Sequence, residues 1–333
     1  MLKPKVVVYN LWPELKDYAR AKLRGFPHAI HTSALTPVSA DPTAEVLVVF
    51  IESAATKDIM ARLPKLRYIT TMSTGYDHID LGAAKKRQIP VSNVPTYGEN
   101  TVAEHAFALI LGLTRKLFES VKRVKEGRYD FRGLRGMDIK GKTLGVIGTG
   151  HIGANVARMA KGFEMAVLAY DAKPNPALAQ TLGFTYVALP ALLKKSDIVT
   201  IHAPLFPATY HLINKKNLAL MKPGALLINT ARGGIVDAEA LLAALNSGRL
   251  AGAGLDVLED ENLLQNFEEV MRHGNTEFKL KTTLVNNLLI DHPNTIVTPH
   301  NAFNSAEALE RIINVTVDNI TSFAQGKIQN RVG

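Results

Sequence analysis

The chain has 333 residues, of which 47% are hydrophobic and 21% are charged, and it contains no cysteine. This composition excludes disulfides, thiolate metal sites and thiol nucleophiles, and it argues against a disordered or low-complexity chain. The formal charge of +9 comes from lysines and arginines scattered in small groups, without the basic stripe of a nucleic-acid interface. A globular chain of this length usually divides into two domains.

The chain gives no sign of a membrane segment or of export. The first ten residues carry only a short apolar run, and the longest apolar stretches, such as residues 46–51 and 106–111, are far too short to span a bilayer. We therefore expect a cytoplasmic protein that has neither a membrane nor a nucleic acid as its partner.

Short β-branched runs alternate with helix-like stretches in the first third of the chain. The runs cover residues 6–9, 46–51, 66–70 and 89–92, and the helix-like stretches include residues 13–23 and 55–63. Strands that alternate with helices indicate a parallel α/β layer. The next segment, residues 100–126, is rich in Ala, Leu and Glu, and predicts one extended helix. We place the first domain boundary there.

A second alternating series follows this helix. Its candidate strands are residues 143–147, 166–170, 198–202, 225–229, 252–255 and 295–298. Six strands with intervening helices fit a complete doubly wound parallel sheet. The last helical segment, residues 306–325, is expected to return to the N-terminal layer, which makes the first domain discontinuous.

A glycine motif follows the first strand of this second series. Residues 142–153 read KTLGVIGTGHIG, in which Gly148, Gly150 and Gly153 form G-x-G-x-x-G before a helix. The glycines permit a tight turn, the approach of a pyrophosphate and close strand-to-helix packing, and the helix N-terminus attracts the phosphates. Asp171 ends the next strand, 18 residues after Gly153, where a carboxylate can bind the adenosine ribose hydroxyls. That carboxylate repels a 2′-phosphate, so NAD is favoured over NADP, although the nearby Lys173 weakens the preference.

A second phosphate-binding pattern overlaps this region. Residues 136–143, GMDIKGKT, match G-x-x-x-x-G-K-T, the loop of nucleoside triphosphate-binding proteins. That loop works only when a helix follows it, because the helix N-terminus must face the phosphates. Here Lys142 and Thr143 lead into a strand, so we reject an ATPase or kinase function.

Polar residues end three of the predicted strands. These strands lead to Arg232, to Asp256 and Glu261, and to His300. In an open parallel sheet, ligands bind at this edge. Each residue alone is better explained as a solvated surface charge. Together they suit the reduction of a 2-keto acid, because an arginine can clamp the carboxylate while a histidine, oriented by a carboxylate, protonates the oxygen that hydride transfer leaves negative.

The sequence resembles the D-isomer-specific 2-hydroxyacid dehydrogenases, with motifs from residue 73 to 303 and a matching domain order over nearly the whole chain. The matching motifs are STGYDHID at 73–80, NVPTYGENTVAEHAFALIL at 93–111, GVIGTGHIG at 145–153, HAPL at 202–205, INTARGGIVD at 228–237, GAGLDVLEDE at 252–261 and TPHNAF at 298–303. The resemblance implies an α/β fold with two Rossmann-like domains. Residues 99–300 would form a doubly wound NAD-binding domain, and residues 1–98 with 301–333 would form a smaller, discontinuous, flavodoxin-like domain that binds the substrate.

The resemblance also implies roles for individual residues. Arg232 would hold the carboxylate and carbonyl of the substrate, His300 would be the acid/base, and Glu261 would pair with it. The substrate would also contact Ser73, Thr74, Gly75, Tyr97 and Phe303. The NAD cofactor would contact Gly148, Thr149, Gly150, His151, Ile152, Gly153, Asp171, His202, Ala203, Pro204, Thr209, Thr230, Ala231, Asp256 and His300. No metal is expected.

Substrate identity and assembly are the last expectations. Tyr97 and Phe303 match the positions that line the substrate pocket in the D-lactate dehydrogenase branch, and two aromatics there favour a methyl-sized side chain such as that of pyruvate. They could instead be packing aromatics. Residues 262–290 lack clear family motifs, so a glyoxylate, hydroxypyruvate or bulkier 2-keto acid reductase stays open, as does a non-catalytic NAD-sensing scaffold like the corepressors of this fold. Family members are commonly dimers joined through the helix at residues 100–126, so a homodimer is expected.

Overall fold

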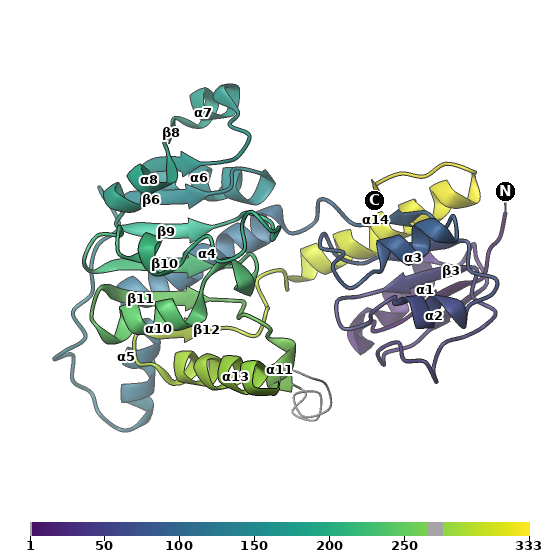
Figure 1. Ribbon diagram of the computed structural model, residues 1–333, viewed down its shortest axis with the longest axis horizontal. Helices are drawn as coiled ribbons and strands as arrows, with labels where there is room; N and C mark the ends of the chain where they lie inside the picture. The colour runs from purple at the N-terminus through teal and green to yellow at the C-terminus, as the bar shows by residue number, and fades with distance from the viewer. Residues whose placement is uncertain (1, 266–275) are drawn as a thin grey trace. The chain divides into compact units, whose positions relative to one another are not determined.

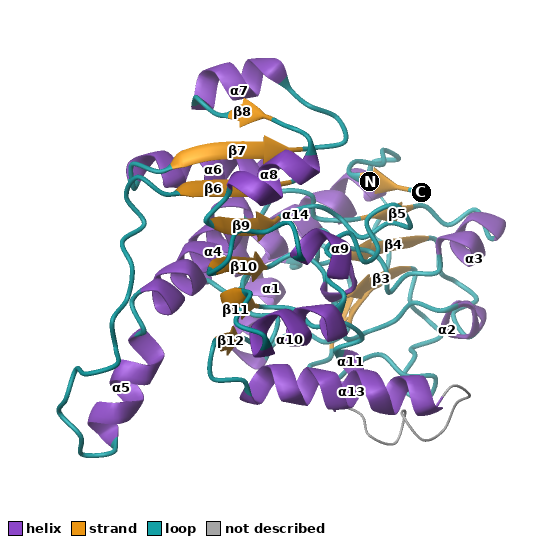
Figure 2. Ribbon diagram, turned by 60° about the vertical axis from the view of Figure 1, so that its left-hand side comes forward, coloured by secondary structure: helices purple, strands orange, loops and turns teal. Residues whose placement is uncertain are grey.

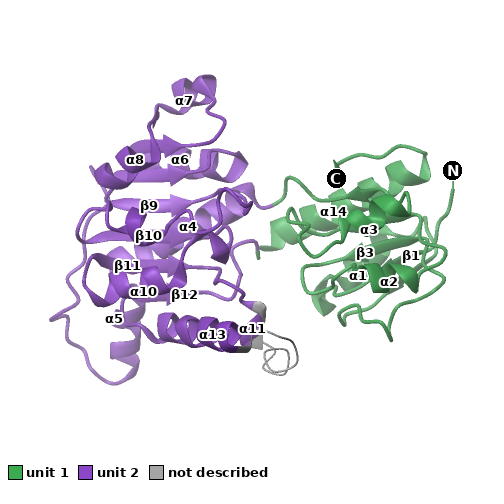
Figure 3. Cartoon of the chain, in the orientation of Figure 1, with its two compact units in different colours: residues 1–97, 304–333 green, residues 98–303 purple. Residues whose placement is uncertain are grey.

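The structure is a computed structural model that describes residues 2–265 and 276–333. The chain divides into two compact units, shown in Figure 3. Unit 1 is Met1–Tyr97 with Asn304–Gly333, and unit 2 is Gly98–Phe303. Within the described ranges, no helix has the length and apolarity needed to cross a membrane.

Unit 1 is a mostly parallel sheet covered by helices. Its elements in chain order are β1 (Val6–Val8), η1 (Pro13–Leu15), α1 (Lys16–Lys22), β2 (His28–Ile30), β3 (Val46–Val49), α2 (Lys57–Ala61), β4 (Tyr68–Thr71), α3 (Leu81–Lys86), β5 (Val91–Ser92), α14 (Ala306–Ala324) and β13 (Arg331–Val332). The strand order is β13-β5-β4-β3-β1-β2, and only the pairing of β13 with β5 is antiparallel. The parallel part has the flavodoxin-like order.

The central strands of unit 1 are buried on both faces. Every residue of β1, β3 and β4 is buried, as expected for a parallel sheet with helices on both sides. The C-terminal helix α14 packs against α1 and β4, and its inner residues Ile312, Ile313 and Ile320 are buried. The predicted return of the C-terminal helix to the N-terminal layer is therefore correct.

Unit 2 is a fully parallel doubly wound sheet. Its elements are α4 (Glu99–Thr114), α5 (Leu117–Lys125), β6 (Thr143–Ile147), α6 (His151–Gly162), β7 (Ala166–Tyr170), α7 (Pro176–Leu182), β8 (Thr185–Tyr186), α8 (Leu189–Lys195), β9 (Ile198–Ile201), α9 (Lys215–Leu218), β10 (Ala225–Asn229), η2 (Gly233–Ile235), α10 (Ala238–Asn246), β11 (Leu250–Leu255), α11 (Asn262–Gln265), α13 (Thr276–Asp291) and β12 (Thr295–Val297). The strand order is β12-β11-β10-β9-β6-β7-β8 (Figure 1). The direction of winding reverses between β6 and β9, which is where ligands bind in such sheets.

Helices cover both faces of the unit 2 sheet. Helices α4 and α6 bury one apolar cluster against it, and α8, α9, α10 and α13 bury another on the opposite face (Figures 1 and 2). The predicted α/β class, with a doubly wound domain and a smaller flavodoxin-like one, is confirmed.

The prediction of one helix over residues 100–126 is wrong. The segment is two helices, α4 and α5, separated by Lys116 in a left-handed conformation with φ of 51°. Helix α4 is buried along one face, whereas no residue of α5 is buried, so tertiary packing supports only the first part. The bend brings the Phe118 ring against Gly112. A Cβ atom on Gly112 would lie only 2.9 Å from this ring.

The remaining differences concern short edge elements. The strands β2, β8 and β13 were not predicted, because they have two or three residues and no buried alternating pattern. In the region without family motifs, residues 262–290, the structure contains α11 and most of α13, whereas residues 266–275 lie outside the described residues. Thr143 begins β6, so a strand does follow the GMDIKGKT pattern.

Candidate active site

The glycine loop between β6 and α6 has the shape that a dinucleotide requires. Gly148 has a φ of +90°, and a Cβ atom on it would lie 2.7 Å from the backbone of His202. A Cβ atom on Gly153 would lie 2.0 Å from the carbonyl oxygen of Gly148, whereas one on Gly150 would meet no atom within 4 Å. Close packing thus requires glycine at positions 148 and 153. Gly150 leaves open space at the N-terminus of α6, where a pyrophosphate fits.

The carboxylate of Asp171 follows β7 beside this loop. It accepts hydrogen bonds from the amide of Thr149 at 2.7 Å, from the hydroxyl of Thr149 at 3.0 Å and from the amide of Lys173 at 2.8 Å. Burial acts to raise the pKa of Asp171, but these hydrogen bonds outweigh it and hold the pKa below its ordinary value. The side chain is therefore a fixed anion, suited to accept hydrogen bonds from ribose hydroxyls.

The loop that follows β9 contains a half-buried histidine, His202. Nε2 of His202 lies 2.8 Å from the hydroxyl of Thr200, and among the described residues its Nδ1 has no hydrogen-bond partner. Burial lowers the pKa of His202 to about 3, so the ring is neutral near pH 7. Further along, the hydroxyl of Thr209 donates to the carbonyl of Pro204 at 2.7 Å and fixes the turn.

His300 and Glu261 form a direct pair in unit 2. Nδ1 of His300 lies 2.6 Å from Oε1 of Glu261, and the two side chains are 30% and 33% exposed. The other carboxylate oxygen of Glu261 accepts the amide of Leu258 at 3.2 Å. His300 itself has a φ of 51°, a conformation that costs free energy and persists only where its surroundings hold it. The imidazole is thus oriented through one nitrogen and accessible to a ligand.

Asp256 is the residue that holds the turn carrying His300. Its carboxylate, 1% exposed, accepts the amides of Asn301 at 2.8 Å and Ala302 at 2.9 Å, and its carbonyl accepts the amide of His300 at 2.8 Å. His105 of α4 adds a contact, its Nε2 lying 3.4 Å from the Asp256 carboxylate. Burial raises the pKa of Asp256, but its hydrogen bonds outweigh this effect and lower it. Sequence analysis missed His105, because nothing in a helical segment shows which strand end it reaches.

The turn that carries Arg232 packs against the one that carries Glu261. The Asn229 side chain closes the arginine turn by donating to the carbonyl of Arg232 at 2.9 Å and accepting the amide of Ala231 at 3.0 Å. A Cβ atom on Gly233 would lie 2.0 Å from the backbone of Leu258, so the two turns are in close contact there. Arg232 and Glu261 are therefore held on one surface of unit 2.

In unit 1, the loop after β4 is fixed by its own hydroxyl groups. Ser73 donates to the carbonyl of Gly75 at 2.6 Å and lies 2.8 Å from the hydroxyl of Thr71. Thr74 donates to the carbonyl of Val94 at 2.9 Å, and Asn93 donates to the carbonyl of Thr74 at 2.8 Å. These bonds make the backbone of residues 73–75 a rigid platform at the carboxyl edge of the unit 1 sheet.

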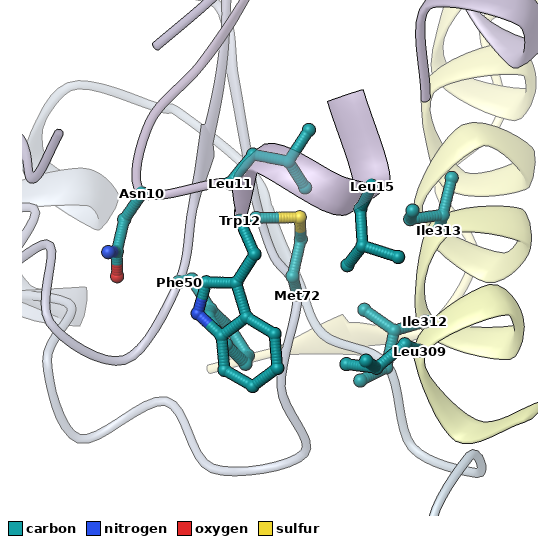
Figure 4. Close-up of a pocket in the computed structure, with 9 residues that line it drawn as sticks. All are labelled: Asn10, Leu11, Trp12, Leu15, Phe50, Met72, Leu309, Ile312 and Ile313. Atoms are coloured by element: carbon teal, nitrogen blue, oxygen red, sulfur yellow. The ribbon is translucent and has the colours of Figure 1, made fainter. Parts of the chain in front are cut away.

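An apolar cavity opens near the same edge, and sequence analysis did not anticipate it. Figure 4 shows Trp12, Phe50 and Met72 on one side and residues of α14 on the other. The cavity is lined by Asn10, Leu11, Trp12, Leu15, Phe50, Met72, Leu309, Ile312 and Ile313. The cavity has a volume of about 250 Å³ with its mouth included.

The two candidate pocket aromatics belong to different units. Phe303 is buried in unit 2 and meets the His300 ring edge-on, with the ring centres 6.5 Å apart. Tyr97 ends the first segment of unit 1, and its carbonyl accepts a hydrogen bond from Arg311 at 2.8 Å. Within the described part of the chain, no three His, Asp or Glu side chains gather in a way that could hold a metal ion.

A doubly wound sheet, a glycine loop with room for a pyrophosphate and a carboxylate after the next strand define a dinucleotide-binding protein of the NAD type. The comparison with known families agrees. Residues 107–302 match the model of the D-isomer specific 2-hydroxyacid dehydrogenase, NAD binding domain. The chain belongs to this family of 2-hydroxyacid dehydrogenases, and its cofactor is NAD.

Individual relatives cover nearly the whole chain. A glyoxylate reductase from Thermococcus litoralis is 35% identical over 98% of this chain and 96% of its own length. A D-lactate dehydrogenase from Aquifex aeolicus, solved with NAD and lactic acid, has a TM-score of 0.83 at 35% identity, covering 96% of each chain. The pyruvate reductase of Chlamydomonas reinhardtii has a TM-score of 0.87 at 37% identity, covering 98% of this chain and 97% of its own.

Proposed function

We propose that the protein reduces pyruvate to D-lactate, and that His300 is the acid/base of the reaction. The observation that carries this proposal is the His300–Glu261 pair, joined at 2.6 Å and held next to the Arg232 turn. NADH bound to unit 2 supplies the hydride. The residues of the chain then have to bind the keto acid, orient it and deliver one proton.

Each residue of the site has one task in this proposal. Arg232 binds the substrate carboxylate and polarises the neighbouring carbonyl. His300 donates a proton from Nε2 to the oxygen that becomes negative, while Glu261, bonded to Nδ1, stabilises the protonated ring. The backbone at Ser73–Gly75 supplies further contacts to the carboxylate. We accordingly assign NAD binding to unit 2, near residues 99–300, and substrate binding to unit 1, near residues 1–98 and 301–333.

A small substrate side chain is favoured by the apolar groups available. Tyr97 and Phe303 match the positions that line the substrate pocket in the D-lactate dehydrogenase branch, and two large aromatic side chains there suit a methyl group better than a branched or aromatic one. The similarity to a D-lactate dehydrogenase and a pyruvate reductase supports pyruvate as the substrate. The similarity to a glyoxylate reductase makes glyoxylate the main alternative.

A substrate panel tests the choice. Initial rates of NADH oxidation with pyruvate, glyoxylate, hydroxypyruvate and phenylpyruvate should give the highest kcat/KM for pyruvate. A higher value for glyoxylate or hydroxypyruvate would contradict the assignment. Phenylpyruvate serves as the bulky control and should be the poorest of the four.

The role of His300 has its own test. His300→Ala should lower kcat by about 10²–10⁴-fold, the usual contribution of general acid–base catalysis, and leave the Kd for NADH within about threefold of wild type. The expected D-lactate product can be checked by chiral chromatography. Wild-type turnover in His300→Ala would remove the acid/base assignment.

We also propose that the protein is a homodimer joined through α4 and α5. Helix α5 exposes Leu117, Phe118, Val121 and Val124, and the following loop exposes Tyr129 at 94% and Phe131 at 85%. Figure 2 shows α5 extending away from the rest of unit 2. Such a concentration of exposed apolar side chains is typical of an interface. Location in the cytoplasm stays a prediction, testable by cell fractionation.

A further inference from the structure

Near the active-site turns, three side chains form a cluster that the proposed reaction does not use. Nε2 of His211 lies 2.7 Å from Oε1 of Glu259, and the hydroxyl of Tyr210 donates to the same oxygen at 2.9 Å. The Tyr210 and His211 rings stack, with centres 4.0 Å apart and an angle of 16°. The Glu259 side chain is only 10% exposed. A carboxylate this buried requires such partners to offset its lost hydration.

The cluster ties together the loops on which the active site depends. Tyr210 and His211 end the loop that begins at His202, and the amide of His211 donates to the carbonyl of Gly234 at 2.9 Å. Next to Gly234, a Cβ atom on Gly233 would lie 2.3 Å from the amide nitrogen of Glu259. The turn after Arg232 is therefore pressed against the backbone of Glu259, two residues before Glu261.

Helix α13 also holds the backbone at Glu259. The Asn286 side chain is completely buried and donates to the carbonyl of Glu259 at 2.8 Å. The helix also packs against α10 and α11, and its exposed Lys281 pairs with Glu239 of α10 at 2.7 Å. The backbone carbonyl and the side chain of Glu259 are thus both held, one by α13 and the other by the loop after β9.

We propose that Glu259, clamped by Tyr210, His211 and Asn286, is a positioning residue that sets the geometry of Glu261 against His300 and of Arg232 against the substrate. This proposal rests on the catalytic roles proposed above. Glu259 does not touch the reacting atoms. It fixes the backbone from Leu258 to Glu261, so that the carboxylate of Glu261 meets the imidazole at hydrogen-bond distance.

Three variants and a control separate positioning from charge and from general stability. Glu259→Leu removes the acceptor, Glu259→Gln keeps an acceptor oxygen but removes the charge, and Asn286→Leu removes the donor to the Glu259 carbonyl. Lys281→Ala, on the exposed side of α13, is the control. Melting temperatures establish that each variant is folded before the assays.

Kinetics is the first measurement. Glu259→Leu should lower kcat for the keto acid by about 10–100-fold and raise its KM, because small misplacements of reacting groups are costly. The Kd for NADH should rise by a smaller factor than kcat falls, because the glycine loop and Asp171 follow β6 and β7, outside the cluster, and only the loop that begins at His202 lies next to it. Asn286→Leu should shift the same constants by a smaller factor, and Glu259→Gln and Lys281→Ala should stay near wild type.

The pH profile is a readout that a purely structural role would not change. Charged and titratable groups near the cluster are His211, Tyr210, Asp237 and Asp260. The pH profile of kcat/KM for the keto acid depends on the contact between Glu261 and the imidazole of His300, which measures 2.6 Å in the wild type. In Glu259→Leu this profile should be displaced from that of wild type, because Glu261 no longer meets the ring. A similar displacement in Glu259→Gln would show that charge alone acts, and would overturn the proposal.

Hydrogen–deuterium exchange measures directly whether Glu259 holds these turns. In Glu259→Leu, segments 232–236 and 258–261 should exchange at least tenfold faster than in wild type, while β6 and β7 stay unchanged. Unchanged exchange in both segments, or faster exchange with kcat and KM within twofold of wild type, would refute the positioning role. If His300→Ala retained full activity, the proposed catalytic function would fail, whereas the exchange result would still establish whether Glu259 holds these turns.

Discussion

Single residues in this protein have properties that their neighbours in the fold create. His300 has a left-handed backbone because Asp256 binds the amides on both sides of the turn through its carbonyl and carboxylate. His202 is neutral because desolvation of its ring lowers its pKa, and Asp171 is ionised because three hydrogen bonds outweigh its desolvation. These environments lead to two predictions at the residue scale.

The first prediction concerns cofactor choice. Asp171→Ala removes the anion that accepts ribose hydroxyls and repels a 2′-phosphate, so the ratio of kcat/KM for NADH to that for NADPH should fall by at least about tenfold. Steady-state rates with each cofactor at saturating pyruvate measure the ratio. Asp171→Asn, which keeps hydrogen-bonding capacity without charge, is the matched control and should fall in between. An unchanged ratio in Asp171→Ala would mean that the carboxylate does not select the cofactor.

The second prediction concerns acid stability. Burial lowers the pKa of His202 from 6.5 to about 3, so the unfolded chain takes up this proton before the folded protein does. The stability due to neutral His202 is therefore present above pH 6.5 and is lost as the pH falls toward 3, by up to about 1.4 kcal/mol per pH unit. His202→Gln should lack this loss in urea titrations of the NAD-free protein. Thr200→Val keeps the histidine and should retain the loss; equal slopes for wild type and His202→Gln would contradict the assignment.

The candidate site was only partly predictable at this scale. Arg232, Glu261 and His300 were found because each follows an apolar strand, and the carboxyl ends of parallel strands share one edge. Their neighbours Glu259, His211 and Asn286 carry no such signal, because only the folded chain shows that a loop after β9 and a helix before β12 reach the same turn. Local sequence identifies strand ends but not which side chains meet across loops.

At the scale of elements, helix α4 shows a difference between the sequence pattern and the packing of the folded chain. Its composition continues into α5, but its buried contacts end at Thr114, and the chain turns at Lys116. The joint between β6 and α6 is the opposite case. There the glycine spacing determines the geometry, because Gly153 and Gly148 approach too closely for any side chain.

The β6–α6 joint leads to a paired prediction. Gly153→Ala places a Cβ atom 2.0 Å from the carbonyl oxygen of Gly148, so the joint must open, with a cost of about 1–3 kcal/mol in unfolding free energy and weaker NADH binding. Gly150→Ala meets no protein atom within 4 Å, so it should keep the wild-type melting temperature and lose only NADH affinity. Calorimetry and fluorescence titration with NADH measure the two effects. Equal melting temperatures for both variants would contradict this account of the joint.

At the scale of the whole molecule, the exposed apolar side chains of α5 lead to a prediction about assembly. Replacing Phe118 and Val121, which are 58% and 45% exposed, with Lys and Glu should convert a dimer into a monomer in sedimentation velocity. Val38→Lys, at a 97% exposed position in unit 1, is the control and should leave the dimer intact. A monomeric wild-type protein would refute the proposed dimer.

Local sequence patterns were enough to predict the fold class, the cofactor and the family, because apolar runs, glycine spacing and strand-end residues are each contained in a short segment. The break between α4 and α5, the apolar cavity of unit 1 and the cluster around Glu259 became visible only in the folded chain. These features depend on segments far apart in the chain: Asn286 donates to the carbonyl of Glu259, and Met72 and Ile312 line the same cavity. Which side chains meet in such contacts follows from the packing of whole elements, which no single stretch of residues contains.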